Sequence, residues 1–426
     1  MKLGARRTLW GLGSVLAIIG ALGLAFALLV PGDKELAARF AVQAEARLGV
    51  KVAIGAVHWQ LAPPALVIED AATLQPEPIV FKRLVIQPNL DALLRGRVKL
   101  SHVLVDGGVM PQLSLRALKI QPAPPDQEDH EPLIEQLRFR NLTWITRHGI
   151  PLEFEGNTFF DGGWLPRQLE LVRSGVQPLT QLTLEREGAS DRWQVQLLLG
   201  GGTAHGQIAL QAQDDGALKL TGQLEPREVE VDSALAAFKR HSAVRGKAAG
   251  RTTLSASGKG VAALAQSLHT RTQFSVASAT LQNIDVDKAI RSLGQDRAGK
   301  TPLQSLTGTM DTQNTPNGIE VRYSGIQARG ETFSASGGGS IINRRINAEV
   351  KVDMIGGLIG VPLKVTGMLN APQVSVAIPV STVAGAAAGA VIGTAVLPGV
   401  GTAIGAGVGA AIGKLFKGDE PKKPAR

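Results

Sequence analysis

The sequence of 426 residues has no cysteine, and aromatic residues make up only 4% of it. The absence of cysteine excludes disulfide scaffolds, thiolate zinc sites and cysteine nucleophiles, and it fits an oxidising compartment. The scarcity of aromatic side chains disfavours an enzyme core built on large rings. What is abundant is glycine, with 50 residues, in a chain that is 44% apolar. That apolar content excludes an intrinsically disordered chain.

Charged residues are also few, at 19%, although the formal net charge is +9. The basic residues are scattered along the chain, whereas nucleic-acid binding needs a basic stripe and aromatic side chains for stacking. Several lysines and arginines lie beside apolar terminal segments, where anionic lipid headgroups are the expected partner. We therefore predict membrane lipid, and not nucleic acid, as the partner.

The first apolar segment follows Lys2, Arg6 and Arg7 and covers residues 8–30. As a helix with a rise of about 1.5 Å per residue it would be about 35 Å long, enough to span a bilayer. A cleaved signal peptide is the alternative, because residues 25–27 (AFA) resemble a cleavage site. The length of the apolar run and its continuation through residues 28–30 favour an uncleaved anchor. The preceding arginines predict a cytoplasmic N-terminus, with residues 33–379 across the membrane.

The second apolar segment is uncharged from residue 365 to residue 413. Glycines four apart fall on one helical face and let two helices approach closely. They flank Pro398-Gly399, so the pattern predicts a glycine-zipper helical hairpin over residues 380–416, followed by a basic tail over 417–426. An Ala/Gly-rich helical pair packed on the protein is the alternative, because each arm is short for a full span. The predicted helix-packing glycines are Gly385, Gly389, Gly393, Gly401, Gly405, Gly409 and Gly413.

Between these segments the pattern is mostly that of strands. An amphipathic helix is predicted over residues 33–48, with Asp33 as N-cap and Gly49 as terminator. Further short helices are expected over 231–239, 261–267 and 285–293, turns at 106–108, 161–163 and 214–216, and an exposed loop at 121–132. Elsewhere apolar residues alternate with polar ones, as in half-buried strands: Val98, Leu100, Val103, Val105, Leu182, Leu184, Val195, Leu197, Leu199, Ile208, Leu210, Leu218, Leu220 and Leu224.

Antiparallel strands with one apolar face must bury that face. The predicted helices are too few to cover it, which leaves a β-sandwich, a closed barrel or an open sheet curled around apolar guests. No catalytic pattern accompanies the strands. The seven histidines are far apart, residues 257–260 lack the glycine and the hydroxyl residue of a phosphate loop, and no nucleophile elbow occurs. We predict no catalytic, cofactor or metal site, and hence a protein that is not an enzyme.

Several stretches together resemble the AsmA family of bacterial envelope proteins. After an anchor and a short helix, that family has strands joined by a "leucine, glycine, basic" pattern, and its C-terminal part has a strand, a short helix, a glycine-rich strand and a closing segment. The matching stretches are residues 48–55, 66–70 and 93–100, and then 274–276 with 283–286, 337–341, and 362–367 with 371–372.

This resemblance implies a fold and a function. The fold would be mainly β with a few short helices: a long curled antiparallel sheet forming an open, apolar groove. The protein would be held in the bacterial inner membrane by one N-terminal pass, with most of the chain in the periplasm. It would bind or transfer phospholipid in outer-membrane biogenesis, with outer-membrane assembly factors as further partners and no cofactor. The alternative is a non-enzymatic envelope scaffold, or a regulator of outer-membrane protein assembly, with a closed β-sandwich.

The expected organisation has five parts. Residues 1–32 are the cytoplasmic stub and anchor, 33–225 the N-terminal helix and β-groove, 226–379 a C-terminal β domain, 380–416 the hairpin and 417–426 the tail. Nine apolar strand residues are the candidates for lining the groove: Val98, Leu100, Leu182, Leu184, Val195, Leu197, Leu199, Leu218 and Leu220.

Overall fold

The computed structural model describes most of the chain between residues 33 and 376. The described ranges are 33–97, 99–118, 134–161, 165–242, 244–259, 261–282, 285–286, 288, 299–315, 318–343, 345–354, 361–368 and 371–376. The predicted anchor, hairpin and tail, with residues 121–132, therefore lie outside the described residues. Within the described part, no helix has the length and apolarity needed to cross a membrane.

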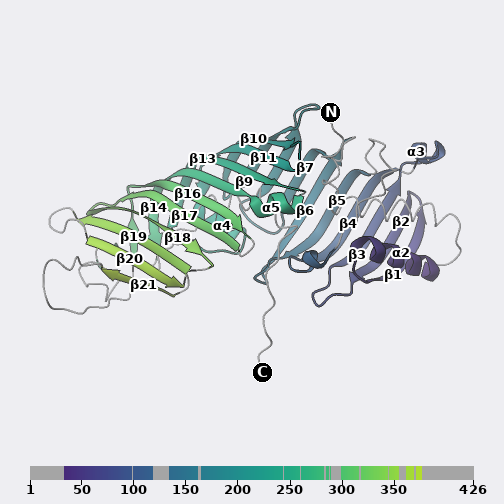
Figure 1. Cartoon of the computed structure of the whole chain (residues 1–426), viewed down its shortest axis with the longest axis horizontal. Coiled ribbons are helices and arrows are strands. Elements are labelled where there is room, and N and C mark those ends of the chain that lie inside the picture. The colour runs from purple at the N-terminus through teal and green to yellow at the C-terminus, as the bar shows by residue number, and fades with distance from the viewer. Residues whose placement is uncertain are drawn as a thin grey trace, which may run out of the picture.

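The strands form one long curled sheet of 21 strands (Figure 1). Consecutive long strands along the chain are neighbours in the sheet, with β11 pairing β13 past the short β12 and β14 pairing β16 past the short β15. The pairings are antiparallel except that between β4 and β5. The prediction of a mainly β protein with a long, open, curled antiparallel sheet and few helices is confirmed. The described strands form one sheet and not the two of the alternative β-sandwich.

The N-terminal half of the sheet contains strands rich in β-branched and leucine residues, which suit a half-buried pleated surface. Their bounds are β1 Val52–Leu61, β2 Pro64–Thr73, β3 Val80–Pro88, β4 Leu100–Pro111, β5 Ile134–Ile145, β6 Pro151–Phe160, β7 Pro166–Arg173, β8 Gln181–Arg186, β9 Arg192–Leu199 and β10 Gly202–Ala212.

The C-terminal half continues the sheet without a break. Its strands are β11 Leu218–Arg227, β12 Val229–Glu230, β13 Val244–Gly258, β14 His269–Gln282, β15 Lys300–Pro302, β16 Ser305–Thr315, β17 Gly318–Arg329, β18 Phe333–Ile342, β19 Arg345–Met354, β20 Val361–Met368 and β21 Ala371–Val376. Strand β11 crosses the domain boundary expected at residues 225/226, and its pairing with β13 carries the sheet onward.

The helices are short and lie along the sheet. They are α2 Asp33–Leu48, α3 Leu90–Leu94, the 3₁₀ helix η2 Ser114–Ala117, α4 Val231–Ala236 and α5 Val261–Ser267. Three of them were predicted: α2 and α5 have the expected bounds, and α4 ends at residue 236, three residues before the predicted end. Of the helix expected over 285–293, residues 287 and 289–293 lie outside the described part.

Helix α2 packs its apolar side on the first strands. Leu36 and Phe40 are buried in a cluster with Val57 and Leu66. Gly49 has a φ of +68°, and its N–H donates to the carbonyl of Glu45 over 2.8 Å. A positive φ after the last helical turn is the conformation that glycine adopts at least cost. The predicted terminator is therefore confirmed.

The predicted turn at residues 106–108 is wrong, because these residues lie inside β4. Gly107 has a φ of +72°, and the residue on either side of it remains paired with β3. The register of β4 on β3 is the same on both sides of Gly107, so the glycine pair lies inside a continuous strand and not at a reversal. The turn predicted at 214–216 is confirmed: Gln213 N–H donates to the carbonyl of Ala217 over 2.7 Å.

Candidate functional site

One face of the sheet is apolar along almost its whole length. The strand registers connect residues directly opposite each other: Leu169 faces Leu184, Leu184 faces Val195, and Val195 faces Gly206. Opposed residues point to the same side of a sheet, and so do residues two apart on a strand. We call this side the apolar face. The register extends it from Leu66, Ile86 and Val103 in the first strands to Met310, Tyr323, Gly339, Ala348 and Val365 in the last.

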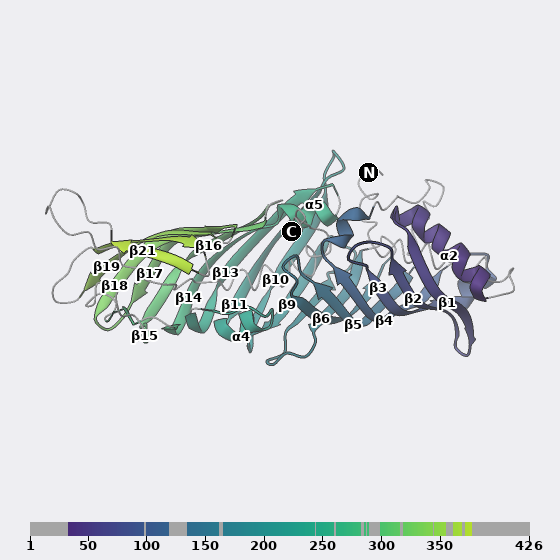
Figure 2. The ribbon, with the colours of Figure 1, turned by 90° about the horizontal axis from the view of Figure 1, so that it is seen from below.

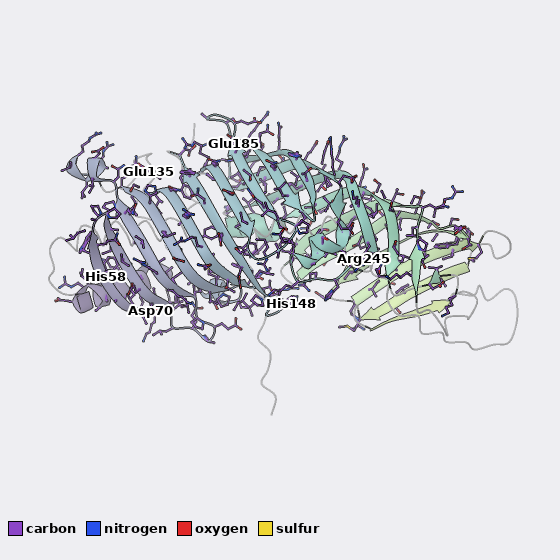
Figure 3. The ribbon with its side chains drawn as sticks, turned by 180° about the vertical axis from the view of Figure 1, so that it is seen from behind. His58, Asp70, Glu135, His148, Glu185 and Arg245 are labelled. Carbon is purple, nitrogen blue, oxygen red and sulfur yellow. The ribbon has the colours of Figure 1, made fainter. Side chains whose placement is uncertain are left out.

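The opposite face is polar. On β9 the residues between the apolar ones are Arg192, Gln194 and Gln196, and all three are exposed. On β13, Arg245 and Lys247 occupy the same side and form ion pairs with Asp232 and Glu228. Figure 3 shows polar side chains along both long edges as well, with Glu135 and Glu185 along one and Asp70 and His148 along the other. The sheet therefore has one face suited to water and one suited to apolar contact.

The predicted groove residues gather on the apolar face. Seven of them, from β8, β9 and β11, belong to one cluster and are 1–5% exposed: Leu182, Leu184, Val195, Leu197, Leu199, Leu218 and Leu220. Leu100 is fully buried in the separate cluster beneath α2. Val98 lies outside the described residues. The middle of the apolar face is thus filled by the protein's own side chains.

Two helices contribute to that filling. Val231 and Leu235 of α4 and Leu264 of α5 join the cluster formed by β8, β9 and β11. Figure 2 shows the two helices at opposite long edges of the sheet, because α4 precedes β13 and α5 follows it. They therefore cover the apolar face from both ends of the strands.

Two arginines lie on the apolar face at opposite ends of the strands. Arg173, at the end of β7, is 5% exposed and has a cation–π contact with Phe154, 5.5 Å from the ring centre. Burial lowers the pKa of its guanidinium, and the Coulombic effect of Glu153 opposes that shift. Arg186, at the end of β8, forms ion pairs with Asp161 and Asp191 and lies 5.5 Å from the ring centre of Trp193.

Beyond β16 the apolar face is accessible to solvent. Five side chains of this face on β17 to β20 are only partly buried: Ile326, Ala328, Ala335, Val350 and Leu363. Four others on the same face are buried: Val321, Phe333, Ile346 and Val352. Two glycines lie among them. A Cβ on Gly337 would collide with the carbonyl of Glu349, and one on Gly339 with Ala348. Neither glycine therefore contributes a side chain to the apolar face.

Sequence reasoning missed this accessible region. The alternation in β19, with Ile346, Ala348, Val350 and Val352, was present in the sequence, as was the glycine run in β18. Alternation identifies a face but not its exposure, since exposure depends on what packs over the strand. The candidates were therefore placed on the most strongly apolar strands, and those are the ones that the structure fills.

The described residues contain no group of three histidine, aspartate or glutamate side chains that could hold a metal ion. His269 and Asp311, on the polar face, are joined by a contact of 2.7 Å between Nε2 and Oδ1. The prediction that the protein is not an enzyme stays a prediction.

The comparisons with known proteins concern the C-terminal end of the chain. A family model described as a glycine zipper matches residues 382–423. All seven predicted helix-packing glycines, from Gly385 to Gly413, lie within this segment, so a glycine-zipper region is present there. No curated protein and no solved structure matches the chain.

Proposed function

We propose that this protein is an AsmA-like protein of the bacterial inner membrane that binds or transfers phospholipid along the apolar face of its sheet, in support of outer-membrane biogenesis. In this proposal residues 8–30 anchor the chain, the sheet lies in the periplasm, and the terminal glycine-zipper hairpin meets a membrane. The mechanism is passive. Apolar strand faces solvate acyl chains, at about 25 cal/mol for each Å² removed from water, while headgroups remain at the edges of the sheet.

The observation that carries the proposal is the length of the apolar face, part of which remains accessible. Two of the 21 strands, β12 and β15, pair with one end of a long neighbour and add no width. With neighbouring strands about 4.8 Å apart, the other strands give the curled sheet a length of roughly 85 Å across its strands. The hydrocarbon layer of one bilayer leaflet is about 15 Å deep. The middle of this face is filled by the protein's own side chains, so its partly buried stretch on β17 to β20 is the part that we propose holds acyl chains.

Accessibility and charge support the same proposal. Large exposed apolar surfaces on proteins mark interaction sites, and the partly buried stretch from Ile326 to Leu363 is the accessible part of the apolar face. The register neighbours on this stretch are apolar or glycine, as in the pairs Ile326–Gly337 and Val350–Leu363. An ionic ligand would lose hydration here without gaining a counter-charge, whereas an acyl chain would lose nothing.

The two terminal segments support a membrane location. Residues 8–30 and the stretch from 365 to 413 contain no charged residue, and each has basic residues on one side, as segments at anionic membrane surfaces do. Two of the AsmA-like stretches are compatible with the proposal: residues 48–55 run from the end of α2 into β1, and residues 337–341 lie in β18.

The proposal is tested with the detergent-purified full-length protein and with a photo-crosslinking residue placed in the chain in cells. Native mass spectrometry should find bound phospholipid. A crosslinker at Val350, on the apolar face, should capture phospholipid, whereas one at the neighbouring exposed Lys351, on the polar face, should not. Protein without bound lipid, together with equal labelling at the two positions, would contradict the proposal.

A further inference from the structure

A small group of threonines interrupts the apolar face between its filled middle and its accessible part. Thr252 on β13, Thr270 and Thr272 on β14 and Thr312 on β16 are all at least nine-tenths buried. The registers place them together: Thr252 faces Thr272, and Thr270 faces Thr312. Their other register neighbours on this face, Leu254, Met310 and Val321, are apolar.

The two pairs differ in their hydrogen bonding. The hydroxyls of Thr252 and Thr272 lie 2.9 Å apart and bond to each other. The hydroxyls of Thr270 and Thr312 are buried and have no hydrogen-bond partner. A buried hydroxyl without a partner costs about 1–3 kcal/mol, so a core selected only for stability would carry valine at these positions. A bound polar partner would recover this cost at both groups, which oppose each other in the register.

The surroundings define the chemistry of that partner. A hydroxyl can donate to a carbonyl oxygen, and the apolar neighbours give no counter-charge for a phosphate, an ammonium or a carboxylate. The partner is therefore neutral and forms hydrogen bonds, as a carbonyl group does by accepting them. On the same face Thr312 opposes Val321, and the next strands lead to the partly buried Ile326 and Val350. An apolar tail could follow these strands while a carbonyl group reaches the threonines.

The end of the apolar face nearest the threonines is covered by α5 and the residue that follows it. Asn314 N–H donates to the carbonyl of Leu268 over 2.9 Å, and the side chain of Gln313 donates to the carbonyl of Ser267 over 3.3 Å. Leu264 and Leu268 are buried at this end. A ligand would therefore have to approach the threonines from the β17–β20 side, past the buried Val321, and end beneath α5.

We propose that Thr270 and Thr312 form a binding site for the ester carbonyl of an acyl lipid whose chain lies along β17 to β20. This inference rests on the proposed function, because it specifies where a lipid bound to the apolar face would be fixed. The two hydroxyls donate to carbonyl oxygens of the ester region, whereas the hydroxyls of Thr252 and Thr272 bond to each other and take no part in the site.

The test compares two probes on the detergent-purified full-length protein: a diacyl phosphatidylglycerol and its dialkyl ether analogue, which has the same headgroup and chain length but no carbonyl. The parent protein should bind the ester lipid about three- to tenfold more tightly, the range for one typical hydrogen bond. Thr270→Val with Thr312→Val should bind both probes with the affinity that the parent has for the ether. The double variant should unfold at the parent's temperature or above it, because it removes two unpartnered hydroxyls.

The control variant is Thr252→Val, which removes one hydroxyl of the bonded pair. It should lower the unfolding temperature and keep the preference for the ester. Equal binding of ester and ether by the parent would overturn the threonine site and leave the proposed function intact. A lower unfolding temperature of the double variant with an unchanged ester preference would also overturn it, since the two hydroxyls would then bond to each other. Binding of neither probe would overturn both proposals.

Discussion

Arg173 of β7 donates a hydrogen bond from Nε to the backbone carbonyl of Ala237, 3.1 Å away, across 64 residues of sequence. Its Nη1 also donates to the carbonyls of Glu153 and Ser174, at 2.7 and 2.8 Å. A cation that satisfies the last carbonyls of a helix stabilises that helix end. One side chain thus holds the end of α4 against β6 and β7 and fixes the helix at one edge of the apolar face.

Replacing this arginine should destabilise the protein. Arg173→Met would remove one donor from three carbonyls, of which that of Glu153 keeps the N–H of Ser174, and we expect a loss of about 2–4 kcal/mol in the free energy of unfolding. Chemical denaturation of the purified protein measures it. The control is Arg227→Met, because Arg227 is exposed and its ion pair with Glu225 is worth less than about 1 kcal/mol. Equal losses of unfolding free energy in the two variants would show that the contact between Arg173 and α4 does not stabilise the protein.

The curl of the sheet depends on glycines where neighbouring strands approach closely. Gly206 of β10 is on the apolar face, and a Cβ there would collide with the carbonyl of Gln223 on β11. Gly206→Ala should therefore cost about 1–3 kcal/mol, the range for overpacking a core, measured by thermal unfolding. Gly216→Ala, in a turn with open space around it, should cost only the roughly 1–2 kcal/mol of a left-handed alanine. A neutral Gly206→Ala would mean that the strands can separate at this point.

An arginine should have different effects in the two parts of the apolar face. At Val350, which is partly buried, the long side chain can reach water, so Val350→Arg should fold and lose bound lipid. At Leu197, which is 1% exposed, the charge would be buried without a partner, so Leu197→Arg should lose several kcal/mol of stability. Thermal unfolding followed by circular dichroism measures the stability of each purified variant, and its lipid content is measured separately. A folded Leu197→Arg protein would mean that the middle of the face opens in solution.

The predicted topology can be measured directly. A reporter that is active only outside the cytoplasm, fused after residue 120, should be active, because Arg6 and Arg7 hold the N-terminus inside. A fusion that is active only in the cytoplasm would contradict this topology. Recovery of a mature chain that begins near Leu28 would show that the first apolar segment is a cleaved signal peptide and not an anchor.

The glycine zipper gives a separate prediction. Gly405→Leu with Gly409→Leu should force the two predicted terminal helices apart, since bulky side chains would fill the contact face. Envelope function, measured as resistance of cells to detergent, should be lost while membrane anchoring through residues 8–30 remains. Leucine at Ala403 and Ala410, which are off the four-residue glycine repeat, is the matched control. Normal function of the glycine variant would show that the segment acts only as a linker and that its glycines do not pack helices.

Several features followed from the sequence because they depend on local physics. Period-two alternation identified β8, β9 and β11, and the helical spacing of Leu36 and Phe40 identified α2. Local rules failed at Gly107, because a glycine with positive φ occurs both in turns and inside strands, and only the pairing with β3 distinguishes the two.

The sequence by itself determined that one side of each strand is apolar and that the chain contains no pattern typical of catalysis. It could not determine whether those sides would form two packed sheets or one continuous curled surface, since both satisfy the same alternation. The tertiary structure decided this through the pairing of each strand with the next, through the parallel step from β4 to β5, and through α4 and α5. Burial depends on contacts between residues distant in sequence. For that reason only the folded chain distinguishes the filled middle around Leu197 from the accessible stretch around Val350.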